Sequence, residues 1–267
     1  MNLLANHIPG TVLLASWLEK NGISRDLQKY YLKSGWLESY GVGALKRPNE
    51  NVQWVGALIS IQRQTDLPVH VGGLTSLSLQ GLSHYIRLDM EPIYLFSTQY
   101  VKLPKWFLDQ EWGKQIIHVK SRFLPADLAL FEYSLDGLDI QLSSPERAIL
   151  ECLHLTPNRF DMVECYQILE GLLNLRPKVL QELLEKCNSI KAKRLFLFMA
   201  SKANHQWLDY VDQTRIELGT GDRILVKGGV YISKFRIQYQ RKWLHYDHPI
   251  IYFTGRPDSA GDAAHSI

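Results

Sequence analysis

The chain has 267 residues, of which 46% are hydrophobic and 21% are charged. At roughly 100–200 residues per domain, this length predicts two domains with real cores, and the composition excludes disorder for most of the chain. The formal net charge of +3 is too small to indicate by itself a protein that binds nucleic acid or a membrane.

Three cysteines, Cys152, Cys165 and Cys187, are too few and too irregularly spaced for a disulfide framework, and the sequence contains no CxxC motif. Free thiols suit a reducing compartment. The apolar runs are far shorter than the roughly 18–20 residues of a membrane span, and the apolar start of the chain lacks the basic segment of a signal peptide. We therefore expect a cytoplasmic protein with no membrane partner.

Two short helices are predicted near the start of the chain. Thr11 is placed to cap the first helix, which Asn21-Gly22 ends. Ser24 is placed to cap the second helix, over residues 25–34. The two helices are thus joined by a tight turn that contains glycine.

A β-hairpin is predicted over residues 36–45, where aromatic and aliphatic residues flank a glycine-rich reversal. Helix, tight turn, helix and hairpin is the order of elements in a winged helix-turn-helix. Helical apolar patterns over 52–64 and 74–82 are expected to support this unit. The first predicted domain is therefore a winged helix-turn-helix at residues 1–92.

A mixed α/β domain is predicted over residues 93–267, so that the fold class is α+β. The expected elements are strands at 93–96, 115–119, 128–133 and 138–142, helices at 145–153, 161–172, 178–187 and 192–203, strands at 223–226, 230–239 and 245–253, and a frayed tail at 257–267.

The second predicted helix has the two sides that a DNA-recognition helix needs, one apolar and one cationic. Arg25, Lys29 and Lys33 recur at i, i+4 and i+8, and Asp26 near the helix start complements the helix dipole. The residues expected at DNA are Ser24 on a phosphate, Arg25, Lys29, Tyr30 and Lys33 in the major groove, and Lys46 and Arg47 at the wing. The alternative is an ordinary amphipathic helix with a solvated cationic side.

Several segments of the sequence resemble the AbiEi antitoxins of type IV toxin–antitoxin systems. They are Gly22-Ile23-Ser24-Arg25, Leu32-Lys33-Ser34-Gly35-Trp36-Leu37 and Gly43-Ala44-Leu45, then Gly72-Gly73-Leu74-Thr75-Ser76-Leu77 with Gly81-Leu82, and Ser144-Pro145-Glu146-Arg147-Ala148-Ile149-Leu150-Glu151. The resemblance covers roughly residues 5–250. It implies a bacterial repressor that binds operator DNA of its own operon through its N-terminal domain. It also implies neutralisation of a co-encoded nucleotidyltransferase-type toxin through the C-terminal domain, without a stable complex.

The charge is unevenly distributed along the chain. Residues 1–50 hold 6 Lys and Arg and 4 acidic residues, residues 51–190 hold 12 and 16, and residues 191–256 hold 12 and 5. The last of these segments therefore carries +7, with aromatic rings interleaved, which is typical of a second nucleic-acid surface. Its candidate residues are Lys191, Lys193, Arg194, Lys227, Lys234, Arg236, Arg241 and Lys242.

An ordinary sheet is the alternative for this basic segment. If residues 230–239 form one regular strand, Lys234 and Arg236 share one face while Phe235 and Tyr239 point to the other.

Enzyme chemistry is not expected. The chain has no Asp-x-Asp pair for a nucleotidyltransferase, no P-loop, and no Asp/Glu-x-Lys to complete a nuclease motif with Asp136 or Asp139. The side chains of Cys152 and His154 point about 200° apart on a helix and cannot pair locally. We interpret the cluster of His, Asp and His at 245–248 as surface groups, and expect no metal and no cofactor.

Two other functions remain open alternatives. One alternative is an interaction protein that neutralises its toxin by direct contact. The other is an RNA-binding protein that acts through the basic C-terminal strands. The operator, the toxin and the oligomeric state are not encoded in any motif.

Overall fold

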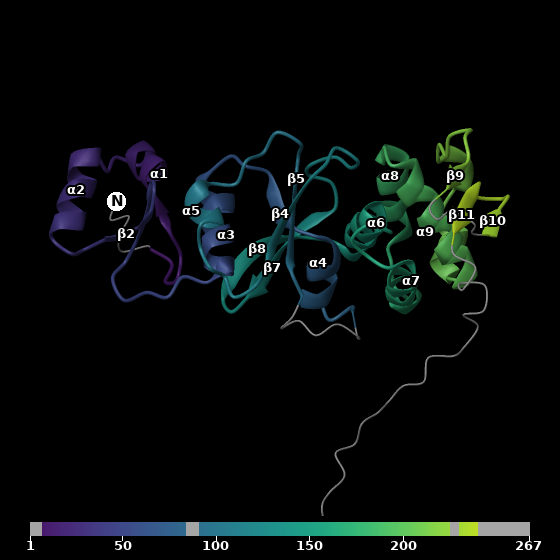
Figure 1. Ribbon diagram of the computed structural model, residues 1–267, viewed down its shortest axis with the longest axis horizontal. Helices are drawn as coiled ribbons and strands as arrows, with labels where there is room; N and C mark the ends of the chain where they lie inside the picture. The colour runs from purple at the N-terminus through teal and green to yellow at the C-terminus, as the bar shows by residue number, and fades with distance from the viewer. Residues whose placement is uncertain (1–6, 84–90, 225–229, 240–267) are drawn as a thin grey trace, which may run out of the picture.

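The computed structural model describes residues 7–83, 91–224 and 230–239. These residues form an elongated molecule in which a small winged unit, a central sheet and a helical block follow one another along the long axis (Figure 1). The mixed α and β structure and the N-terminal winged helix agree with the predicted α+β class.

The winged unit combines two helices with a three-stranded sheet in the order β1-β3-β2. Its elements are β1 (Leu13–Leu14), α1 (Ala15–Lys20), α2 (Arg25–Lys33), β2 (Glu38–Gly41) and β3 (Ala44–Lys46). The predicted second helix and hairpin are confirmed. The first helix starts later than predicted, at Ala15, because Leu13 and Leu14 pair with β3 instead.

The central sheet has five strands in the order β6-β5-β4-β8-β7. The strands are β4 (Val69–Val71), β5 (Ile93–Ser97), β6 (Ile116–Lys120), β7 (Leu130–Leu135) and β8 (Leu138–Ser143). β4 lies between β5, to which it is antiparallel, and β8, to which it is parallel. The sheet therefore crosses the domain boundary expected at residue 92, and β4 is a strand where none was predicted.

Alternating side chains give the sheet two buried faces. Ile93 and Leu95 pack with α3 (Trp54–Gln64) and α5 (Lys105–Leu108), in a core that also reaches the winged unit. Tyr94 and Phe96 face the opposite core. That second face is covered by α4 (Gly73–Leu79) and α6 (Pro145–Leu155), which pack against each other. The prediction that the segment containing α4 supports the winged unit is therefore wrong.

The helical block continues from α6 and ends in a small sheet. Its remaining elements are α7 (Met162–Gly171), α8 (Pro177–Lys186), α9 (Ile190–Lys202), the 3-10 turns η1 (Gln206–Tyr210) and η2 (Gln213–Arg215), and the strands β9 (Arg223–Ile224), β10 (Val230–Ile232) and β11 (Ile237–Tyr239). β10 and β11 form an antiparallel hairpin. The single strand predicted over 230–239 is therefore wrong, because the chain reverses at Ser233–Arg236, where Arg236 has φ of 50°. The strand and tail predicted beyond residue 244 lie outside the described residues.

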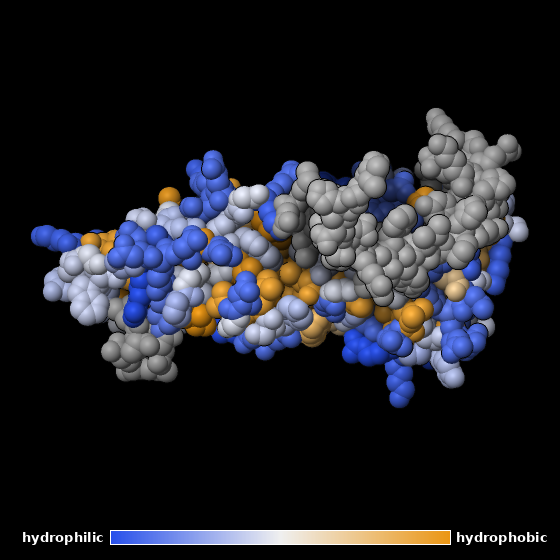
Figure 2. Space-filling view, turned by 90° about the horizontal axis from the view of Figure 1, so that it is seen from below, coloured by the Kyte–Doolittle hydropathy of each residue, from blue (hydrophilic) through white to orange (hydrophobic). Residues whose placement is uncertain are grey.

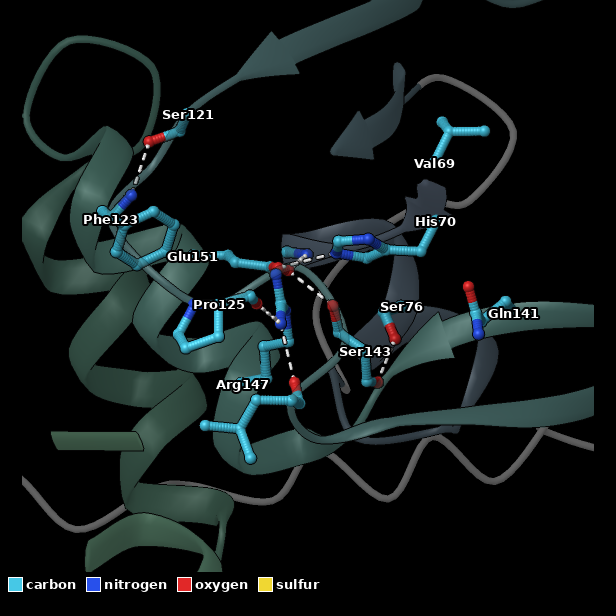
Figure 3. A network of polar contacts seen from close by, with 12 residues as sticks. Val69, His70, Ser76, Ser121, Phe123, Pro125, Gln141, Ser143, Arg147 and Glu151 are labelled. Carbon is cyan, nitrogen blue, oxygen red and sulfur yellow. Dashed lines mark hydrogen bonds and ion pairs between the residues drawn. The ribbon is translucent and has the colours of Figure 1, made fainter. Parts of the chain in front are cut away.

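A buried carboxylate ties the sheet to the helical block (Figure 3). The side chain of Glu151 on α6 is 0% exposed. Its two oxygens accept hydrogen bonds from His70 Nε2 at 2.9 Å, the Gly73 backbone N at 2.8 Å, Ser143 Oγ at 2.7 Å and Arg147 Nε at 2.8 Å. Glu151 thus joins β4, α4, β8 and its own helix.

Charge and hydrogen bonding decide the protonation of this cluster. Burial by itself would raise the pKa of Glu151, but its contacts with His70 and Arg147 outweigh burial and lower that pKa to about 2. Burial lowers the pKa of His70, and its Nε2 donates to the carboxylate. Arg147 and Glu151 form the charged pair. The Arg147 Nη1 also donates to the carbonyls of Pro125 and Leu128, at 2.7 and 2.6 Å.

The geometry of this cluster requires glycine at both positions of the Gly72-Gly73 pair. A Cβ on Gly72 would lie 2.3 Å from Glu151 Oε2 and 2.6 Å from Phe96 Cδ2, so no larger residue fits there. Gly73 has φ of +53°, a conformation that side chains disfavour, and this turns its N–H toward Glu151.

We expect Glu151→Gln to lower the free energy of unfolding by about 3–5 kcal/mol, because Arg147 is left as a buried cation without its counter-ion. The wild-type protein should also lose stability as the pH falls from 4.5 toward 2, since the folded-state pKa of Glu151 lies below its unfolded value. Urea denaturation as a function of pH measures both effects, and the variant should lack that part of the pH dependence.

The matched control is Glu182→Gln on α8, which removes an exposed partner of Lys186 and should cost at most about 1 kcal/mol. Equal losses in the two variants would contradict the central role of Glu151.

Candidate nucleic-acid interface

Helix α2 is fixed to the winged unit by one buried polar side chain. Gln28 is 5% exposed, and its Nε2 donates to the carbonyls of Ala15 and Ile23, at 3.1 and 2.9 Å. Ser24 caps the helix by accepting a hydrogen bond from the Leu27 N–H. The Ser24 hydroxyl accepts in that bond and retains its own hydrogen as a donor. These contacts determine which side of α2 faces outward.

The outward side of α2 carries the predicted DNA-binding side chains. Arg25 is 77% exposed and its Nε donates to Glu19 Oε1 at 2.7 Å, while Lys29 is 76% exposed and its Nζ donates to Asp26 Oδ1 at 3.1 Å. Tyr30 is 63% exposed, and Lys33 is exposed in the last turn of the helix. Hydrophilic residues dominate this end of the molecule, whereas apolar residues gather over its middle (Figure 2).

The hairpin of β2 and β3 forms the wing. Its tip is Gly41-Val42-Gly43, where Val42 is 85% exposed. Lys46 lies at the base of the wing, where its Nζ contacts Glu38 Oε1 at 3.0 Å and donates to the Glu50 carbonyl. Lys46 is thus engaged within the unit, and Arg47 beside it is half-buried.

Residues of α5 and the segment after it support the wing. Gln110, just after α5, donates from Nε2 to the Tyr40 carbonyl at 3.1 Å. Trp106 of α5 lies against Gly41 so closely that a Cβ on this glycine would be 2.7 Å from the Trp106 Cβ. The wing is therefore held by residues from outside the first ninety.

One exposed aromatic residue and one set of exposed cations were not predicted from the sequence. Trp36 is 65% exposed and follows Gly35, which has φ of 74°, directly after α2. A second set of cations lies along and beyond β5 and β6, with no carboxylate partner among the described residues. These are Lys102, Lys105, Lys120 and Arg122, the last 4.5 Å from the ring centroid of exposed Tyr100. Residues 98–122 hold five Lys and Arg against two acidic residues, which an average over residues 51–190 conceals.

Two family models together match nearly the whole chain. One is described as the N-terminal domain of the AbiEi antitoxin, a transcriptional regulator, and matches residues 1–88. The other is described as the AbiEi antitoxin, a transcriptional regulator of a type IV TA system, and matches residues 90–240. The chain belongs to the AbiEi antitoxin family. A search of curated proteins finds no match.

The fold of this AbiEi family member is similar to that in the crystal structure of the RV2827C protein from Mycobacterium tuberculosis. The TM-score is 0.56 at 13% sequence identity, over 88% of this chain and 87% of that chain. At this identity, the similarity concerns the fold alone.

Burial removes several cations from the second candidate surface of this AbiEi protein. Lys193 and Arg194 are 2% and 1% exposed. The Arg194 guanidinium donates to the carbonyls of Leu218, Gly219, Gly221 and Arg236. Lys191 is half-buried, and its Nζ donates to the carbonyls of His154 and Thr156. Arg194 thus ties α9 to the segment before β9 and to the β10–β11 turn, and Lys191 ties α9 to the end of α6.

Two members of that surface are exposed in the described residues. Lys234 lies 5.2 Å from the Phe235 ring centroid, and Arg236 Nε contacts Asp222 Oδ1 at 3.0 Å. Both residues lie in the turn of the β10–β11 hairpin, so the prediction that they share one face of a regular strand is wrong. Lys227, Arg241 and Lys242 lie outside the described residues.

The residues considered for enzyme chemistry lie in a turn, in an ion pair or in the core. Asp136 is in the β7–β8 turn with φ of 52°, and Asp139 contacts Arg63. Cys152 is buried, and the His154 ring stacks on Phe123. Within the described ranges, no group of three or more His, Cys, Asp or Glu is placed to hold a metal ion. Over the same residues, no helix has the length and apolar character needed to cross a bilayer.

We expect Gln28→Ala to lower the free energy of unfolding by about 1–3 kcal/mol, because two carbonyls lose their buried donor. Thermal unfolding measures the loss. The control is Lys29→Ala on the exposed side of the same helix, which should change stability by no more than about 0.5 kcal/mol. If both variants were equally stable, Gln28 would not fix the orientation of α2.

Proposed function

We propose that the protein represses its own operon by placing α2 in the major groove of operator DNA. The observation that carries this proposal is the outward side of α2, on which Arg25, Lys29 and Lys33 are exposed while Gln28 fixes the opposite side. A recognition helix needs this division between a docking side and a cationic side. The transcriptional-regulator description of the family supports it.

The ion pairs of α2 do not prevent phosphate binding. The partners of Arg25 and Lys29 lie on the protein surface, where water and salt screen such pairs and leave them weak. A phosphate that replaces Glu19 or Asp26 therefore displaces a weak contact and releases counter-ions from the DNA.

We expect the double variant Arg25→Ala/Lys29→Ala to bind its operator more weakly and with a shallower salt dependence. The slope of log K against log salt should fall by about 1 for each phosphate that the variant no longer neutralises. Fluorescence anisotropy across a salt series, with DNA from upstream of the gene, measures both quantities.

The matched control is Lys178→Ala/Lys186→Ala, which removes two exposed cations from α8. Its affinity and slope should equal those of the wild type. Wild-type affinity and slope in the α2 variant would exclude α2 as the recognition helix.

We also propose that the protein neutralises a co-encoded nucleotidyltransferase-type toxin without a stable complex. The family description as a type IV antitoxin supports this.

Co-expression with the neighbouring gene tests this second proposal. We expect growth arrest by the toxin to be relieved, while the tagged antitoxin purifies alone. A salt-stable stoichiometric complex would favour neutralisation by direct contact instead. Co-purification of RNA with the protein, measured by the ratio of absorbance at 260 and 280 nm, would favour the RNA-binding alternative.

A further inference from the structure

Asp26 occupies the outermost line of α2. At 3.6 residues per turn, it lies about 160° around the helix from buried Gln28. Its side chain is 91% exposed, more than those of Arg25 and Lys29. Tyr30 and Lys33 continue the same line toward the other end of the helix. Asp26 alone on this line belongs to the first turn.

This position is the one that meets base edges. In helix-turn-helix proteins, N-terminal residues of the recognition helix contact the bases, whereas flanking cations contact the backbone. A helix inserted with its outward side foremost therefore brings Asp26 to the floor of the major groove. Arg25 and Lys29 then lie to one side, nearer a phosphate strand.

A carboxylate in the groove is a selective group. It only accepts hydrogen bonds, so the N7, O6 and O4 acceptors of guanine, adenine and thymine repel it. In the major groove only the exocyclic amino groups, N4 of cytosine and N6 of adenine, donate to it. Phosphates repel it as well, so Asp26 lowers the affinity for DNA in general.

Capping does not account for Asp26. The Ser24 side chain already accepts the Leu27 N–H. A negative charge anywhere in the first turn interacts favourably with the helix dipole, so the dipole does not require the carboxylate to be on the outermost line. The contact of Asp26 Oδ1 with Lys29 Nζ at 3.1 Å is exposed and therefore weak. Lys29 can turn to a phosphate and leave the carboxylate to accept a hydrogen bond from a base.

We propose that Asp26 determines sequence specificity by selecting a base with an exocyclic amine, cytosine or adenine, at one position of the operator. This assignment rests on the proposed DNA-binding function. It predicts that the carboxylate strengthens discrimination while it weakens total affinity.

Selection from a random duplex library tests the assignment. The full-length wild type is used to enrich a binding site, and affinities are then measured for every single base-pair substitution in that site. We expect one position with cytosine or adenine preferred by about tenfold or more. Asp26→Ala should reduce that preference to about twofold or less, and bind non-specific duplex several times more tightly.

Two further variants make the result specific. Asp26→Asn should shift the preference at the same position toward adenine, because an amide pairs with its N6 and N7. Asp66→Ala removes an exposed carboxylate between α3 and β4 and should leave every preference unchanged. Circular dichroism confirms that all variants are folded.

The outcomes separate the two proposals. If the wild type enriches a site but Asp26→Ala keeps every base preference, the assignment of Asp26 is overturned and the DNA-binding function stands. If the wild type enriches no sequence, specific operator binding and the role of Asp26 are overturned together.

Discussion

One buried carboxylate, that of Glu151, joins the central sheet to the helical block. Glu151 sits in the second turn of α6 and accepts hydrogen bonds from β4, from the start of α4, from β8 and from Arg147. A buried charge is tolerated only with a close counter-ion and with its lone pairs satisfied, and this cluster meets both conditions. Because the contributing segments are far apart in sequence, Glu151 can ionise in the core only when the sheet and the helical block have assembled.

The position of the winged unit follows from the same sheet. α3 packs between β8 and β1, and α5 together with Gln110 supports the wing. The central sheet thus serves as a platform whose one face is closed by the Glu151 cluster and whose other face carries the winged unit. α2 lies at one end of the described chain (Figure 1), and its Arg25 and Lys29 side chains are 77% and 76% exposed.

Local signals in the sequence predicted local structure well. The Ser24 cap, the Gly22 and Gly35 reversals and the apolar spacing of the helices involve neighbouring residues, so their physics is readable from the chain. β4 was missed because three residues are too few to show an alternating pattern, and its two partners are distant in sequence. The β10–β11 turn was missed because its residues 233–236 contain no Gly, Pro or Asn. Arg194 was misplaced because charge counts treat every cation as exposed, whereas backbone carbonyls satisfy this one in the core.

Site-specific photo-cross-linking shows whether α2 touches the bases. A benzophenone amino acid is placed at Tyr30 or, as a control, at Tyr210, which is 78% exposed in η1 of the helical block. On irradiation with operator DNA, position 30 should cross-link to nucleotides within the operator, and position 210 should not. Cross-linking from position 210 with none from position 30 would contradict the account.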